Sequence, residues 1–88
     1  MREIRRSSRF KKDYKKAKKQ HKDIDLLKDV IIKLAAGKSL SPKYRDHPLR
    51  GSLGKFRELH LEPDWLLIYQ ITARELLLAR VGSHSDLL

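Results

Sequence analysis

Three histidines of this 88-residue chain lie where its C-terminal half turns or where a strand begins or ends: His47, His60 and His84. Histidine is the side chain best suited to proton transfer near neutral pH, because its charge changes in that range. Asp64 follows His60 by four positions, and Arg80 precedes His84 by the same spacing. Together these residues suggest acid–base chemistry on a polyanion, and the basicity of the chain makes RNA the first substrate to consider.

Cleavage of an RNA backbone needs only a few groups. A base removes the proton of the ribose 2′-OH, an acid protonates the leaving 5′-oxygen, and a cation stabilises the charge on the phosphate. His60 or Asp64 could act as the base, and His84 as the acid. Arg80 could clamp the phosphate in a bidentate manner, while His47 could fold over the same place from the preceding loop. This chemistry requires no cofactor, and we expect none.

Each of these five residues also has a purely structural interpretation, in which it only stabilises its own turn or strand. Arg80, for example, can pair with Glu58 or Glu75 across strands. Trp65 begins the most apolar strand, so the residues themselves favour a place in the core over one that stacks on a base. The structural interpretation weakens only when the five are considered together.

A metal site is the rival use of the same side chains. Three histidines and one aspartate could form a tetrahedral zinc site. Their spacing matches no compact motif such as His-Glu-x-x-His, and a cation would have to overcome a strongly positive chain. We therefore expect no metal.

The positive charge of the chain is concentrated at its N-terminal end. The net charge is +10, and residues 1–22 alone carry eleven Lys or Arg against two Asp or Glu. Such a field attracts a phosphate backbone or an acidic protein with strong salt dependence, although a lysine face can also serve solubility alone. The lysines expected to contact a substrate are Lys11, Lys12, Lys15, Lys16, Lys18 and Lys19.

The hydrophobic pattern predicts helices first and strands later. The N-terminal part is expected to form a short strand at 1–6 with Ile4 pointing inward, a helix from Ser7 or Ser8 to about Lys19, and a second helix with its apolar stripe from Ile24 to Leu34 and Gly37 just past its end. A loop with one short helical turn is expected at 37–54. Strands are expected at 56–61, 65–71 and 75–81, followed by a helical turn that begins at Ser83 or Ser85. Short connections between the last three strands predict an antiparallel meander. The strand from Trp65 is apolar on both faces, so it should be central and covered by the helices. The predicted class is α+β, with an N-terminal helical hairpin packed on a small, mostly antiparallel sheet.

Length and composition limit the possible classes of protein. A chain of 88 residues predicts a single domain at 1–88 with one modest core, so an active site would be a surface groove. The absence of cysteine excludes disulfides and thiolate chemistry. No stretch is long enough to span a bilayer and the N-terminus lacks a hydrophobic signal core, so we expect a cytoplasmic protein without a membrane partner.

Three segments resemble a known family. They are Asp46-His47-Pro48-Leu49-Arg50-Gly51, the run from Phe56 to Tyr69, and the run from Arg80 to Leu87. These segments closely resemble the YafQ-type toxins of the RelE/ParE superfamily of bacterial toxin–antitoxin systems, and the likeness extends over essentially the whole chain. The resemblance implies a RelE/ParE-like fold and a ribosome-dependent endoribonuclease that cuts mRNA in the A site of the 70S ribosome, uses the 2′-OH and leaves a cyclic phosphate.

The resemblance also carries residue roles and partners. The family's functional residues correspond to His47, His60, Asp64, Trp65, Arg80 and His84, which makes Trp65 a substrate contact. A cognate acidic antitoxin of the DinJ-like kind would neutralise the basic surface and block the site. The chain departs from the family at its end, where Leu87-Leu88 stands in place of an aromatic residue that the family often has, and a leucine stacks poorly on an mRNA base.

Two other functions use the same features. A non-catalytic module could hold rRNA or an acidic protein through the lysine-rich helix, with structural histidines. A gyrase-directed toxin of the ParE kind could use the same scaffold, but such relatives generally lack the histidine set.

Overall fold

The fold is built on a five-stranded sheet with the strand order β1-β5-β4-β3-β2. The computed structural model describes residues 1–87. The strands are β1 (Glu3–Arg6), β2 (His47–Pro48), β3 (Arg57–Glu62), β4 (Trp65–Ile71) and β5 (Glu75–Gly82). β1 pairs with β5 in parallel, and the other neighbouring pairs are antiparallel. The predicted meander is therefore confirmed for β3, β4 and β5.

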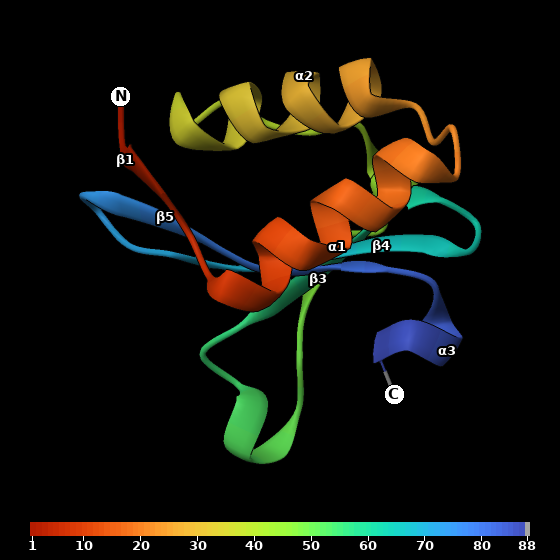
Figure 1. Ribbon diagram of the computed structural model, residues 1–88. Helices are drawn as coiled ribbons and strands as arrows, with labels where there is room; N and C mark the ends of the chain where they lie inside the picture. Colours follow the sequence, from red (N-terminus) through yellow and green to blue (C-terminus); the bar gives the residue numbers. More distant parts are fainter. Residues whose placement is uncertain (88) are drawn as a thin grey trace.

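Two helices, α1 (Ser8–Lys19) and α2 (Ile24–Ala35), lie on one side of the sheet (Figure 1). Each begins at a side-chain cap: the Ser7 hydroxyl accepts from the N–H of Phe10, and the Asp23 carboxylate accepts from the N–H of Leu26. The short helix α3 (His84–Leu87) and the segment 49–56 lie on the opposite side (Figure 1). The predicted α+β class is confirmed.

The core lies between the two long helices and the sheet. β4 is the middle strand, and its alternate residues Trp65, Leu67 and Tyr69 are at most 1% exposed and belong to this core. Leu66 points to the other side of the sheet and is also buried, at 3% exposed. The prediction of a central strand with two apolar faces is confirmed. No helix within residues 1–87 combines the length and the hydrophobicity that crossing a membrane requires.

The structure corrects three details of the expected elements. Ile4 is 41% exposed rather than internal, because β1 is the edge strand and the helices leave that edge partly uncovered. The segment expected to be a loop contains two 3-10 turns, η1 (Pro42–Tyr44) and η2 (Gly51–Leu53), with the strand β2 between them. The strand expected at 56–61 lies one residue later, at Arg57–Glu62. The strand expected at 75–81 extends one residue further, as Glu75–Gly82.

Candidate active site

Three imidazole rings form a row on the side of the sheet away from α1 and α2. His47 on β2 pairs with Glu58 on β3, and His60 follows two positions later, so the three side chains share one face. The ring centroids of His47 and His60 are 6.2 Å apart, and those of His60 and His84 are 6.0 Å apart. Two neighbouring rings at this spacing can contact one phosphodiester group from either side.

Asp64 holds His84 in place at one end of this row. Its Oδ1 accepts a hydrogen bond from the backbone N–H of His84 at 2.9 Å and lies 2.6 Å from Nδ1 of the ring. Both hydrogen bonds lower the pKa of Asp64, and the one from the backbone N–H has the larger effect. Since an ionised carboxylate only accepts, Nδ1 carries the hydrogen and Nε2 is left for proton exchange. The arrangement makes Asp64 the residue that orients His84, and a poor base.

Gly82, at the end of β5, allows the chain to turn back toward Asp64. A Cβ atom on Gly82 would lie 3.1 Å from the Cβ of Asp86, which is closer than ordinary side-chain contacts. The hydroxyl of Ser83 then accepts from the N–H of Asp86, as expected for a residue that begins a helical turn. The Gly82-Ser83 pair therefore brings His84 back over the sheet toward Asp64.

His60 lies in the middle of the row and is largely buried. Its side chain is only 12% exposed, and its Nδ1 has no hydrogen-bond partner among residues 1–87. Burial lowers the pKa of His60, and the positive charge of Arg45 lowers it further. A neutral imidazole at physiological pH can accept a proton, which is what a general base requires.

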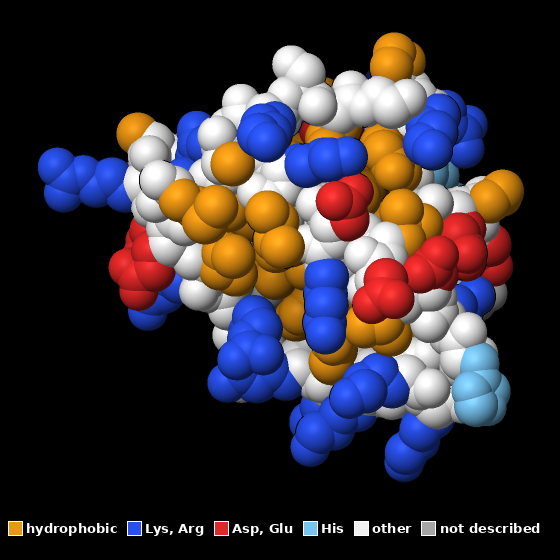
Figure 2. Space-filling view, turned by 90° about the horizontal axis from the view of Figure 1, so that it is seen from above, with side chains coloured by type: hydrophobic (Ala, Val, Ile, Leu, Met, Phe, Trp, Pro, Cys, Tyr) orange, Lys and Arg blue, Asp and Glu red, His pale blue; other side chains and the backbone are white. Residues whose placement is uncertain are grey.

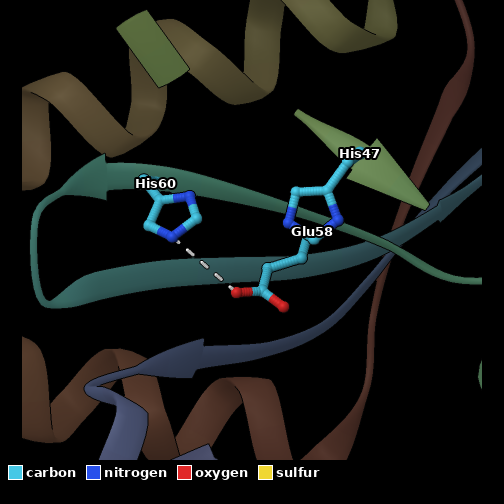
Figure 3. A group of neighbouring side chains, drawn as sticks. All are labelled: His47, Glu58 and His60. Atoms are coloured by element: carbon cyan, nitrogen blue, oxygen red, sulfur yellow. Dashed lines mark ion pairs between the residues drawn. The ribbon is translucent and has the colours of Figure 1, made fainter. Parts of the chain in front are cut away.

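Glu58 is a member of the site that the sequence analysis considered only as a partner of Arg80. Its carboxylate lies 4.0 Å from Nε2 of His60 and its side chain is 17% exposed. Figure 3 shows Glu58 between His47 and His60, with the three side chains turned toward one another. One ligand atom from each residue lies within 4.8 Å of the others, so the group has the spacing to hold a metal ion. The signal in the sequence was the alternation along β3, which puts Glu58 and His60 on one face.

The segment that carries His47 is anchored through its neighbour Asp46. The carboxylate of Asp46 accepts from Nε of Arg57 at 2.9 Å and from the hydroxyl of the buried Tyr69. Burial, and then the hydrogen bond to Asp46, raise the pKa of Tyr69 well above its ordinary value, so this hydroxyl stays a donor. His47 itself is exposed, and its Nδ1 lies 3.1 Å from the carbonyl of Pro48. The contact within its own turn considered from the sequence therefore exists, but His47 also borders His60.

Arg80 pairs with Asp13 of α1 and not with Glu58 or Glu75. Its Nε and one terminal nitrogen donate to the two carboxylate oxygens at 2.9 and 3.2 Å. Asp13 also accepts from the backbone N–H of Val81, at the edge of β5 that β1 does not reach. The pairing of Arg80 with Ile68 places it on the same face of the sheet as the histidine row. Within residues 1–87 the three remaining N–H groups of its guanidinium form no hydrogen bond, so they can contact a phosphate.

Replacing Asp13 with Ala should weaken both the fold and the site. Three hydrogen bonds to a largely buried carboxylate disappear, so we expect the free energy of unfolding to fall by about 2 kcal/mol. Urea unfolding measures this, and Asp29→Ala is the matched control because Asp29 forms an exposed pair with Lys33 on α2. Equal stability of the two variants would contradict the role of Asp13.

Of the predicted substrate contacts, Trp65 lies in the core and the lysines of α1 lie on the surface. Trp65 is 1% exposed in the core, so the expectation that it contacts substrate is corrected: its ring offers no surface on which a base could stack. The predicted lysines of α1 are exposed; Lys16 forms an ion pair with Asp86 of α3 at 3.0 Å, and Lys18 lies over the ring of Tyr14. Leu88, where an aromatic residue was expected from the resemblance, lies outside the described residues.

Comparisons with known proteins identify the family of this chain. Residues 2–88 match the family model described as the bacterial toxin of a type II toxin–antitoxin system, YafQ. The chain belongs to the YafQ family. The mRNA interferase toxin YafQ of Escherichia coli strain K12 is 42% identical over 87 residues, which cover 98% of this chain and 95% of that protein.

Solved structures of two bacterial toxins have the same fold as this chain. YafQ in the E. coli DinJ–YafQ complex superposes with a TM-score of 0.93 at 42% identity, covering 100% of this chain and 99% of that one. A metal-bound toxin from Helicobacter pylori superposes with a TM-score of 0.93 at 49% identity, with both chains fully covered. The resemblance found in the sequence is confirmed.

Proposed function

We propose that this chain is an mRNA interferase toxin that cuts mRNA in the ribosomal A site and so stops translation. Its identity of 42% to E. coli YafQ, which is named an mRNA interferase toxin, supports the activity. The observation that carries the chemistry is the row of His47, His60 and His84 on one face of the sheet. Such a row supplies a proton acceptor and a proton donor within reach of a single phosphodiester group.

In the proposed reaction His60 is the base and His84 the acid. Neutral His60 takes the proton of the ribose 2′-OH, and the 2′-oxygen forms a bond to the adjacent phosphorus. The bond from phosphorus to the 5′-oxygen breaks, and that oxygen takes the proton from Nε2 of His84. The products are a 2′,3′-cyclic phosphate and a free 5′-OH, and no metal takes part.

The other site residues position or stabilise. Asp64 holds the His84 ring and balances its charge while the ring is protonated. Arg80, oriented by Asp13, stabilises the charge that gathers on the phosphate. Glu58 and His47 border His60 and can receive the proton that it has taken.

The basic surface supports the proposed partners. Many Lys and Arg side chains, with fewer Asp and Glu side chains among them, border an apolar area on the side of the molecule that the helices cover, as Figure 2 shows. This charge suits the rRNA that surrounds the A site of the 70S ribosome, and equally an acidic, DinJ-like antitoxin that would neutralise it. The proposal includes a single RelE/ParE-like toxin domain at 1–88 with a helical hairpin at its N-terminus, acting in the cytoplasm.

The lysines of α1 should supply affinity and leave the chemistry to the histidine face. Replacing Lys11, Lys12 and Lys15 with Gln should weaken association with the ribosome, because each lost phosphate contact reduces the slope of log affinity against log salt by about one. Cleavage of mRNA at saturating toxin should change little. Binding measured across a salt series checks this, with Lys33→Gln as the control because that lysine is already paired with Asp29. If the salt slope of the variant equals that of the parent, the lysines do not supply the affinity for the ribosome.

The proposed activity is tested by mapping the 5′ ends of cellular mRNA after the toxin is expressed. Cuts in phase with codons are expected, and they should disappear when translation initiation is blocked. Growth arrest without codon-phased ends would contradict the proposal and favour a non-catalytic or a gyrase-directed toxin, which a supercoiling assay would distinguish.

A further inference from the structure

A pocket of roughly 260 Å³ lies at the edge of β3, next to the histidine row. It forms because β2 pairs only with Arg57 and Glu58, and the 3-10 turn η1 packs along the rest of that edge. Its polar lining includes Lys43, Arg45 and His60, and its apolar lining includes Leu26 and Pro63. His60 thus belongs both to this pocket and to the row of rings.

Two positive charges face this pocket without an acidic partner. Within residues 1–87, neither Lys43 nor Arg45 forms an ion pair. The ammonium of Lys43 lies 5.2 Å from the ring centroid of Tyr44, which is buried and anchors the turn. The carboxylate that lines the pocket, Glu62, is 3.9 Å from Lys22, which offsets its charge. The pocket therefore favours an anion.

The backbone holds Arg45 in an uncommon conformation at this place. Its φ of 48° and ψ of 46° are left-handed, which is disfavoured for residues other than Gly and Asn and is often found at functional sites. The next residue, Asp46, is fixed by Arg57 and Tyr69, so the turn is anchored on both sides. The direction of the Cα–Cβ bond of Arg45 is thereby set by the fold.

We propose that this pocket is a phosphate subsite for the mRNA, in which Arg45 and Lys43 bind the phosphodiester next to the one that is cut. A strand with its scissile phosphate between His60 and His84 continues along β3 into the pocket. Phosphate contacts of this kind fix the register of a nucleic acid, and arginine suits them because its guanidinium binds in a bidentate manner. The inference rests on the proposed function and adds a group that decides which phosphate reaches the histidines.

The test uses ribosome-bound mRNA with one neutral methylphosphonate placed on either side of the cut. KM and kcat are measured for the parent, Arg45→Asn and Arg45→Lys at one and the same near-neutral pH, because the proposed reaction needs a neutral His60 and a protonated His84. Asn tolerates the left-handed backbone and removes the charge, whereas Lys keeps the charge. Arg74→Asn, at the exposed turn between β4 and β5, is the matched control.

For the parent, a neutral linkage on one side of the cut should raise KM about tenfold, the effect of one charge-assisted hydrogen bond. Arg45→Asn should raise KM about tenfold on ordinary mRNA, and the neutral linkage should then add nothing. Arg45→Lys keeps the charge but not the bidentate contact, so it should restore part of the affinity, and Arg74→Asn should match the parent. If the parent cuts but Arg45→Asn keeps the parental KM or the full sensitivity to the linkage, the subsite is refuted. If the parent cuts no mRNA, the proposed function itself fails and the subsite with it.

Discussion

Replacing His84 with Ala should reduce the rate of mRNA cleavage by about a hundredfold to ten-thousandfold, the range for loss of a general acid. His84 is the ring whose Nδ1 is held by Asp64, which leaves Nε2 to protonate the leaving 5′-oxygen. The ring is nearly half exposed, so its loss should leave the stability of the fold almost unchanged. Single-turnover cleavage on the ribosome, with binding measured separately, checks this expectation.

His21→Asn is the matched control for His84→Ala. His21 is exposed at the turn after α1 with a φ of 58°, which Asn tolerates, and it lies outside the histidine row. The control should cut at the parental rate. Equal rates for His84→Ala and the parent would remove His84 from the reaction and return it to a structural role.

Replacing His60 with Ala should slow cleavage by about a hundredfold or more and should change the pH dependence of what remains. A base acts in its neutral form, so activity is lost as the pH falls through its pKa. Burial and the charge of Arg45 lower the pKa of His60, so the acidic limb of the parent should lie below the ordinary histidine value of 6.5. Measuring kcat against pH for the parent and His60→Ala tests both points.

Arg45→Asn provides an internal check on this pH dependence. Since the charge of Arg45 contributes to the lowered pKa of His60, its removal should move the acidic limb upward, toward the ordinary value. The Arg74→Asn control should leave the limb in place. An acidic limb that stays unchanged in both His60→Ala and Arg45→Asn would show that another group is the base.

Local patterns were sufficient to predict much of the fold. The apolar run of β4 predicted both the bounds of that strand, Trp65–Ile71, and its central position. Ser7 or Ser8 was expected to begin the first long helix, and Ser7 caps it, because capping depends on only a few neighbouring residues. The short connection after β4 predicted the antiparallel pairing with β5 that brings Asp64 toward His84.

Contacts between residues distant in the sequence could not be predicted in this way. Asp13 and Arg80 are 67 positions apart, and their pairing depends on how α1 crosses the end of β5. The exposure of Ile4 follows from the edge position of β1, which no local pattern indicates. The alternation along the strand indicated that Glu58 and His60 share one face. A charged residue on a strand usually faces solvent, however, so its type alone did not indicate a role in the site.

The central claim is that the histidine face cuts RNA through the ribose 2′-OH, and one substrate tests it most directly. Ribosome-bound mRNA with a single 2′-deoxyribose on the 5′ side of the cut should resist the toxin, whereas the unmodified mRNA should yield a 2′,3′-cyclic phosphate and a 5′-OH. Cleavage of the deoxy-substituted mRNA at the same bond, or a product with a 5′-phosphate, would contradict this account.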